Sequence, residues 1–192
     1  MDIAQRIACH VVDIADAPLD SQAAIDFVAD DVFGAIDLFI GRVRTVSHGR
    51  TCVAVEYDMF DALALTVFER TASEAIAAFG PNAKCYIAHA KGKLGVGDLA
   101  VVIAFGSGHR DEAFRGCRQA IEAVKHQAPI WKREYFVDGH TTWSEGCSLC
   151  GDDHAHDGTP DATHESGHAH DHTHTHTHDH ASVHDRVADV GH

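Results

Sequence analysis

The sequence predicts an α+β fold, in which a mixed or antiparallel sheet packs against helices and a disordered histidine-rich tail follows. Helix-like and strand-like periodicities occur in the first 146 residues without regular alternation, whereas regular alternation is typical of α/β proteins. After Cys150 apolar residues become scarce, and twelve of the eighteen histidines follow. We therefore expect one folded domain over residues 1–146 and an acidic low-complexity tail over residues 147–192.

Two strands and a long helix are predicted in the first half of the chain. Residues 32–44 (VFGAIDLFIGRVR) and 51–60 (TCVAVEYDMF) have the composition of strands, and the polar turn TVSHGR separates them. A helix is predicted from Asp61, and Gly80 with Pro81 ends it. The apolar residues that recur in it at helical spacing are Leu65, Phe68, Ala72, Ile76 and Phe79.

The second half adds two strands and a second helix. Residues 83–92 (AKCYIAHAKG) alternate as a strand does, and residues 99–105 (LAVVIAF) predict a buried strand. Residues 111–127 have helical spacing and carry acids in the first turn, where they complement the helix dipole. Pro129 breaks this helix. The side chains expected to face the core from it are Phe114, Cys117, Ile121 and Val124.

The formal net charge of −14 limits the partners. A nucleic-acid surface needs clustered cations that release counterions, so we expect no nucleic-acid partner. No apolar run is long enough to span a membrane, and the N-terminal segment has acids where a secretory signal has a basic region. Four isolated cysteines lie in apolar surroundings, which is typical of reduced thiols. We therefore expect a cytoplasmic enzyme whose anionic ligands are small and held locally.

Cationic residues stand where predicted strands and helices begin or end. Arg44 closes the first strand, His109 and Arg110 open the second helix, and Lys125 and Lys132 flank its break. Free N–H groups at a helix start favour anions, and small-molecule sites are often built at such positions. Each residue also has a structural explanation, because a terminal lysine complements the helix dipole and an arginine pairs with surface acids. Spacing alone does not show that these side chains converge.

The tail contains candidate metal ligands. Cys147, Cys150, His154 and His156 form a C-x2-C-x3-H-x-H arrangement, which offers four ligands adequate for zinc. A redox pair or two free thiols remain alternatives for the cysteines. The alternating histidines that follow would chelate nickel, zinc, copper or cobalt with low selectivity. Because Asp and Thr interrupt the tract, we interpret it as a natural metal-associating segment, with an expression tag as the alternative.

The segments FIGRVR, GDLAVVIAFGSGHRDEAF, VKHQAPIWKRE and DGHTTW resemble, in order and spacing, the catalytic (large) subunits of molybdopterin synthase, over roughly residues 30–146. This resemblance implies a hammerhead-like fold. It also implies sulfur transfer from the C-terminal Gly-Gly thiocarboxylate of a small ubiquitin-like subunit to cyclic pyranopterin monophosphate, forming the molybdopterin dithiolene. A homodimer within a heterotetramer is implied as well, and no cofactor is expected for catalysis.

The resemblance implies roles for the cationic residues. Lys125 and Lys132 match the two family lysines beside the thiocarboxylate and are expected to be catalytic, Lys125 the more directly. Some of the other cations would reach the pocket from a second protomer. The expected substrate-binding residues are Arg44, His109, Arg110 and Trp131. The rival function is metal binding or storage through the tail with zinc or nickel, but a metal carrier does not need this ordered cation set.

Overall fold

The computed structural model describes residues 3–80 and 82–144. The strands in this part of the chain are β1 (Ile7–Asp13), β2 (Ala35–Arg42), β3 (Val46–Ser47), β4 (Arg50–Met59), β5 (Lys84–Gly95), β6 (Leu99–Ser107), β7 (Ile130–Phe136) and β8 (Thr141–Ser144). The helices are the short 3-10 helix η1 (Ile3–Gln5) and the α-helices α1 (Ser21–Val28), α2 (Asp61–Phe79) and α3 (Arg110–Gln127). Within these residues, no helix is long and apolar enough to cross a membrane.

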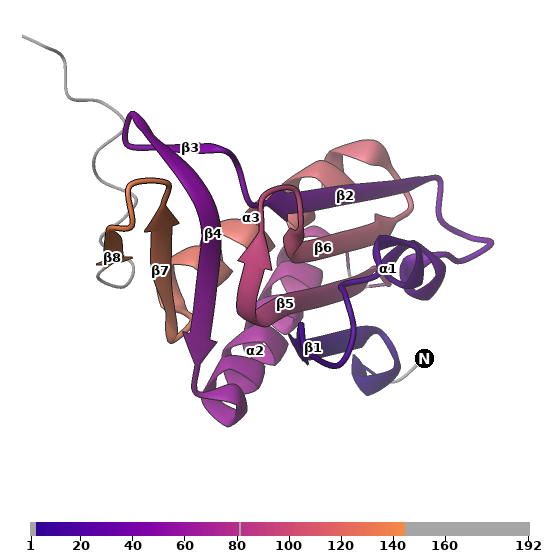
Figure 1. The fold of residues 1–192 in the computed structure, drawn as a ribbon. Helices are drawn as coiled ribbons and strands as arrows, with labels where there is room; N and C mark the ends of the chain where they lie inside the picture. Colours follow the sequence, from indigo (N-terminus) through magenta and orange to yellow (C-terminus); the bar gives the residue numbers. More distant parts are fainter. Residues whose placement is uncertain (1–2, 81, 145–192) are drawn as a thin grey trace, which may run out of the picture. The chain divides into compact units, whose positions relative to one another are not determined.

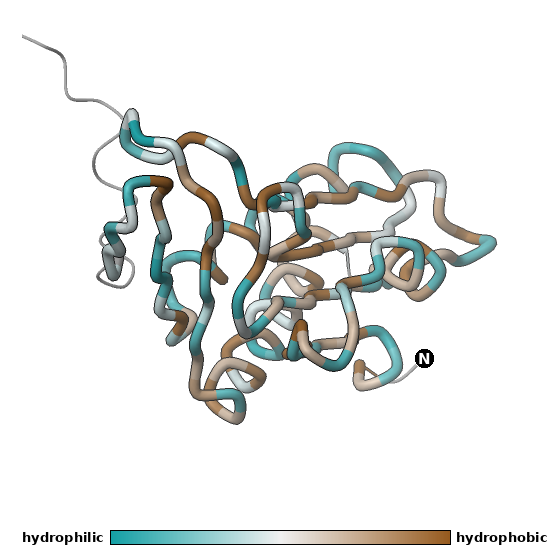
Figure 2. The backbone as a smooth tube through the Cα atoms, viewed as in Figure 1, coloured by the Kyte–Doolittle hydropathy of each residue, from teal (hydrophilic) through white to brown (hydrophobic). Residues whose placement is uncertain are grey.

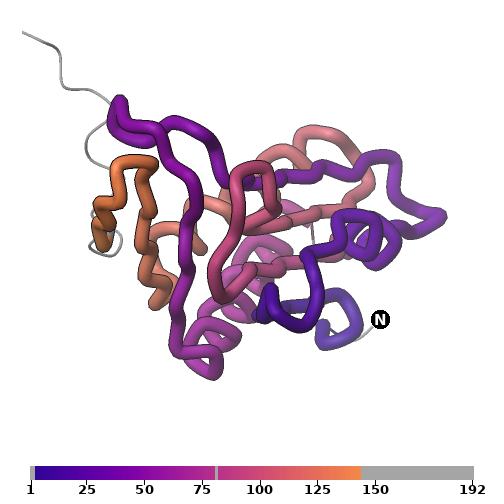
Figure 3. Tube along the Cα trace, viewed as in Figure 1, coloured from indigo at the N-terminus to yellow at the C-terminus, as the bar shows by residue number. Residues whose placement is uncertain are grey.

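The strands form one mixed sheet in the order β2-β6-β5-β4-β7-β8 (Figure 1). Strand β1 pairs in parallel with β5, and the remaining pairs are antiparallel. Strand β5 joins the two parts of the sheet, because its first half pairs with β1 and β6 and its end pairs with β4. Figure 3 shows the indigo β1 segment beside the much later β5. The predicted α+β class with a mixed sheet is therefore confirmed.

Two apolar clusters lie on opposite faces of this sheet. Along β6, Ile103 and Phe105 join the cluster under α2 and α3, whereas Val102 and Ala104 join the cluster that contains Val28 of α1. Figure 2 shows the apolar, brown character of β2 and β6. Alternate side chains of a strand point to opposite faces, so a strand covered on both sides reads as a continuous apolar run. This explains why LAVVIAF was recognisable as buried.

The predicted helix at 111–127 is present as α3, but one of its predicted core residues is wrong. Cys117, Ile121 and Val124 are buried, whereas Phe114 is 57% exposed. The buried face of α3 also contains small residues: Ala113, Gly116 and Ala120. At Gly116 a Cβ would lie 2.6 Å from the ring of Phe105, so the helix backbone approaches β6 closely. Phe114 is large and apolar, but it lies at the edge of the buried face of α3 and not within it.

Candidate functional site

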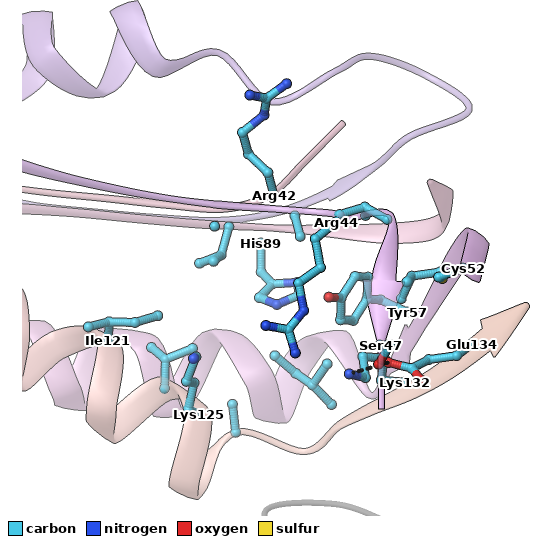
Figure 4. Close-up of a pocket in the computed structure, with 18 of the residues that line it drawn as sticks. Arg42, Arg44, Ser47, Cys52, Tyr57, His89, Ile121, Lys125, Lys132 and Glu134 are labelled. Carbon is cyan, nitrogen blue, oxygen red and sulfur yellow. Dashed lines mark hydrogen bonds and ion pairs between the residues drawn. The ribbon is translucent and has the colours of Figure 1, made fainter. Parts of the chain in front are cut away.

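A pocket of about 440 Å³ lies between the sheet and the C-terminal end of α3 (Figure 4). Its lining comes from the end of β2 and the loop after it, from β4, β5 and β6, from the end of α3, and from β7. The volume is in the range of small-molecule sites. The polar side chains of the lining that matter below are Arg44, Ser47, Tyr57, His89, Lys125, Lys132 and Glu134.

The break between α3 and β7 brings the two lysines to one pocket. The N–H of Ala128 donates to Val124 O at 3.1 Å, and Ile130 N–H donates to Ala128 O at 2.8 Å, so the helix stops and a strand starts within three residues. Pro129 sits between these bonds and cannot donate one of its own. Lys125 lies in the last turn of α3 and Lys132 lies on β7. Both line the pocket.

Arg44 reaches the same pocket from the loop after β2. The pairing of β2 with β6 is irregular between Gly41 and Arg42. Figure 4 shows Arg42 pointing to the other side of the sheet, and its Nε donates to Gly97 O at 2.9 Å. The guanidinium of Arg44 extends in the opposite direction, beside His89. Arg44 therefore faces the pocket from the sheet, while Lys125 faces it from α3.

Glu134 is a buried acid that holds Lys132 in place. The residue is 4% exposed, and its Oε1 accepts from Ser47 Oγ at 2.8 Å and pairs with Lys132 Nζ at 2.8 Å. Burial alone would raise the pKa of Glu134, but the hydrogen bonds from Lys132 and Ser47 outweigh it and lower that pKa. The turn that presents Ser47 is a two-residue hairpin, with positive φ at His48 (49°) and Gly49 (72°) as in a type I′ turn.

One wall of the pocket consists of two neutral rings. His89 on β5 is buried, and Tyr57 on β4 packs edge-on against it with ring centroids 4.9 Å apart. Burial lowers the pKa of His89 to about 4. Burial, with the nearby Glu134 and Cys52, raises the pKa of Tyr57 to about 12. Both side chains are therefore uncharged at neutral pH, and the positive charge of the pocket comes from its arginine and lysines.

The structure does not bring the other predicted substrate-binding residues to this pocket. His109 caps α3 at its far end and Arg110 is the first residue of that helix. Lys125 lies fifteen positions after Arg110 on this helix, which is about 22 Å at a rise of 1.5 Å per residue. Trp131 is 46% exposed. It precedes Lys132 on β7, so its side chain points to the opposite face of the strand.

Sequence reasoning missed Glu134, Ser47, Tyr57 and His89 as site residues. Glu134 stands two residues after Lys132, and on a strand this spacing places both side chains on one face. His89 shares the alternating pattern of Cys85 and Ile87, which places the three side chains on one face of the predicted strand. Ser47 and Tyr57 carried no comparable signal, because a polar turn residue and a strand tyrosine are common.

The candidate metal ligands Cys147, Cys150, His154 and His156 lie outside the described residues. Within residues 3–80 and 82–144, no group of three or more His, Cys, Asp or Glu side chains is arranged to hold a metal ion. Cys52, Cys85 and Cys117 are free, buried thiols, and Cys9 is a free thiol that is partly buried.

The family model of the MoaE protein matches residues 14–127, which is more than half of the chain. This chain belongs to the MoaE family. A MoaE-family relative from Synechococcus elongatus, named molybdopterin synthase catalytic subunit, is 40% identical over 148 residues, which cover 77% of this chain and 90% of the relative. The family suggested by the sequence motifs is therefore confirmed.

Solved structures agree with this MoaE assignment. The crystal structure of molybdopterin synthase from Staphylococcus aureus superposes with a TM-score of 0.65 at 30% identity, covering 70% of this chain and 95% of that one. A chain from the Helicobacter pylori complex of subunits 1 and 2 of molybdopterin-converting factor shares the fold, with a TM-score of 0.57 at 22% identity, covering 72% of this chain and 90% of that one.

Proposed function

We propose that this chain is the catalytic subunit of a molybdopterin synthase, which converts cyclic pyranopterin monophosphate into molybdopterin by adding two sulfurs as a dithiolene. The observation that carries this proposal is the pocket in which Arg44, Lys125 and Lys132 meet from three separate segments of a MoaE-family chain. These are the cations whose order along the chain resembles the family motif. All residues that line the pocket are among those that the structure describes. We expect this reaction to need no cofactor.

The pocket suits this reaction because both reactants are anions. A phosphorylated pterin and a thiocarboxylate each need positive charge nearby, and fixed cations act most strongly where water is excluded. Arg44 and Lys125 are exposed, whereas Lys132 is partly buried against Glu134. We assign the phosphate to Arg44 and the thiocarboxylate to the lysines.

Lys125 is the residue that we place nearest the chemistry. In each transfer the thiocarboxylate sulfur forms a bond to a pterin carbon, which gives up its oxygen substituent. Water then attacks the acyl carbon, so that the acyl–sulfur bond breaks, the sulfur stays on the pterin and the partner's tail leaves as a carboxylate. An ammonium beside these atoms stabilises the developing negative charge and exchanges protons with them. Lys132 is held at 2.8 Å by Glu134, so it provides a fixed charge that positions the pterin and the tail.

A dimer of this chain accounts for His109, Arg110 and Trp131. The first two lie about 22 Å along α3 from Lys125, too far for their side chains to reach the pocket of their own chain. We therefore assign them to the pocket of a second protomer, where they would add cations for the phosphate. Trp131 is exposed and precedes Lys132 on β7, so its side chain points to the opposite face of the strand. There it would contact the substrate or the small subunit at that interface.

The sulfur donor that we propose is a small ubiquitin-like subunit with a C-terminal Gly-Gly thiocarboxylate. In Helicobacter pylori, subunits 1 and 2 of molybdopterin-converting factor form a protein–protein complex. We propose the corresponding assembly here, with a homodimer of this chain inside a heterotetramer. Free thiols at Cys52, Cys85 and Cys117 suit a reducing compartment, so we place the enzyme in the cytoplasm.

A reconstituted assay tests this function. Purified protein, thiocarboxylated small subunit and cyclic pyranopterin monophosphate are mixed, and the dithiolene product is followed. Lys125→Ala is expected to lower the rate about 100-fold or more, as removal of a charge-stabilising donor typically does. The matched control is Lys93→Ala, since Lys93 is on β5 but lies over the Tyr135 ring at 4.0 Å, outside the pocket lining. Full transfer by Lys125→Ala would contradict the role of this lysine, and an inactive wild type would contradict the function.

Metal binding by the tail is the second candidate function, because residues 151–192 hold twelve of the eighteen histidines. Its ligands would include Cys147, Cys150, His154 and His156, with zinc or nickel as the metal. A chain truncated after Gly146 separates the two functions. Unchanged sulfur transfer by the truncated chain, together with loss of zinc and nickel binding in calorimetry, would make the tail accessory. Loss of sulfur transfer would show that the tail is required.

A further inference from the structure

In the neutral wall of the pocket, the two ring nitrogens of His89 have different hydrogen-bonding roles. His89 is 7% exposed, and Nδ1 of its ring lies 2.9 Å from the backbone oxygen of Ala90. A carbonyl oxygen only accepts, so Nδ1 must carry the ring proton in this contact. Burial lowers the pKa of His89 to about 4, so the ring stays neutral at pH 7. Its Nε2 is then an unprotonated nitrogen with a lone pair, on a side chain that lines the pocket (Figure 4).

Most charged side chains of the described pocket lining are donors, and its other side-chain acceptors include one carboxylate and two hydroxyls. The ammonium groups of Lys125 and Lys132 and the guanidinium of Arg44 only donate.

Glu134 can accept at two oxygens, but its Oε1 already receives both Ser47 Oγ and Lys132 Nζ, and the residue is 4% exposed. The hydroxyls of Ser47 and Tyr57 can accept as well as donate, whereas His89 Nε2 is a neutral group of the described lining that only accepts. A phosphate is satisfied by such a site. The fused-ring part of a pterin is not, because its amino group and ring N–H groups need acceptors, and an N–H buried without one costs binding free energy.

We propose that His89 is a substrate-recognition residue, which accepts a hydrogen bond at Nε2 from an N–H of the pterin ring system. This inference rests on the proposed function and adds how the ring, as opposed to the phosphate, is recognised. Tyr57 holds the imidazole in place by its edge-on contact, at an interplanar angle of 77°. The ring of the substrate would thus face β4 and β5 while its phosphate faces the cations.

Two amide substitutions separate the nitrogens of the imidazole. The amide of Gln extends to the position of Nε2, whereas the shorter Asn reaches only the position of Nδ1. Binding of cyclic pyranopterin monophosphate to the full chain is measured by calorimetry for wild type, His89→Gln and His89→Asn. We expect His89→Gln to bind within about threefold of wild type and His89→Asn to bind about tenfold more weakly, the loss typical of one hydrogen bond. The control is His10→Gln on the neighbouring β1, whose ring packs on Tyr86 outside the pocket.

A measurement on the wild-type protein avoids any effect of substitution on folding. The imidazole nitrogens are labelled with ¹⁵N, and the ligand is titrated in. An Nε2 that accepts a hydrogen bond shifts upfield, whereas the Nδ1 signal, already bonded to Ala90, stays nearly constant. An unchanged Nε2 signal with saturating ligand would overturn the proposal, as would equal affinities of the Gln and Asn variants.

The proposal and the proposed function fail in different ways. Ligand binding that shifts Nε2, without sulfur transfer when the thiocarboxylated partner is added, would contradict the synthase function and support the role of His89. Normal sulfur transfer with an unresponsive Nε2 would contradict only the role of His89. A wild type that does not bind the pterin monophosphate would contradict both.

Discussion

Glu134 forms an ion pair with Lys132 in the pocket. We expect the loss of its charge to lower the free energy of unfolding more than most single substitutions do. In Glu134→Gln, Lys132 keeps its charge in a partly buried position and loses the carboxylate at 2.8 Å. Breaking a buried pair on one side leaves an uncompensated charge, so we expect a loss of about 2–4 kcal/mol in the free energy of unfolding, measured with denaturant. The control is Glu74→Gln, because the Arg70–Glu74 pair spans 3.9 Å with both side chains half exposed. A loss below about 0.5 kcal/mol is expected there.

The same residue predicts a pH dependence. The pKa of Glu134 is lowered in the folded protein from its ordinary value of 4.5, so the unfolded chain binds more protons than the folded chain between the two values. The contribution of the carboxylate is therefore fully present above pH 4.5 and is lost as the pH falls through the folded-state pKa. Denaturant unfolding from pH 7 to pH 3 should show the difference between wild type and Glu134→Gln shrinking in acid. A difference that stays constant would contradict the shift.

At the scale of the element, α3 depends on one small residue. A Cβ at Gly116 would lie 2.6 Å from the ring of Phe105, which is fully buried. Gly116→Ala should therefore lower the free energy of unfolding by about 1–3 kcal/mol, although alanine is the better helix former. The comparison is Gly108→Ala, where nothing lies within 4 Å of the added carbon. Stability equal to wild type in Gly116→Ala would mean that α3 can move away from β6.

The elements also show what could be predicted from the sequence. The long helices and strands β2, β4, β5 and β6 were predicted because each has a clear period or a continuous apolar run. Helix α1 was not predicted: eight residues are marginal as an isolated helix, and α1 is stabilised by burying Ala24 and Val28 against the sheet. No strand is predicted at residues 130–136, where β7 lies. The alternation of side chains along residues 130–136 corresponds to a strand because this segment pairs with β4, which is distant in the sequence.

The same reasoning applies to the site. The motif identified the two lysines and Arg44, and the structure places them in one pocket. The buried partners Glu134 and His89 depend on pairing between distant strands, which no local pattern specifies. His109 and Arg110 illustrate the opposite limit, since their motif is clear but their own chain holds them about 22 Å from Lys125. Their role in substrate binding therefore depends on the second protomer that we propose.

At the scale of the whole described domain, the apolar cluster around Val28 predicts cooperative unfolding. This cluster includes Val55 of β4 and Phe136 of β7, so it connects α1 to the part of the sheet that holds the lysine-bearing strand. Val28→Ala should cost about 2 kcal/mol by removing buried methyl groups. Both tryptophans of the chain, Trp131 and Trp143, lie on β7 and β8, so fluorescence reports on that region alone.

We therefore expect Val28→Ala to lower the unfolding midpoint seen by tryptophan fluorescence as much as the midpoint seen by far-ultraviolet circular dichroism, because a two-state transition gives one midpoint for every probe. The control is Val32→Ala, since Val32 is 76% exposed and its loss should leave both midpoints unchanged. If Val28→Ala lowered the midpoint measured by circular dichroism but left the fluorescence midpoint unchanged, β4, β7 and β8 would unfold separately from the rest of the domain. In that case Lys132 would stand on a unit that can open independently of α1.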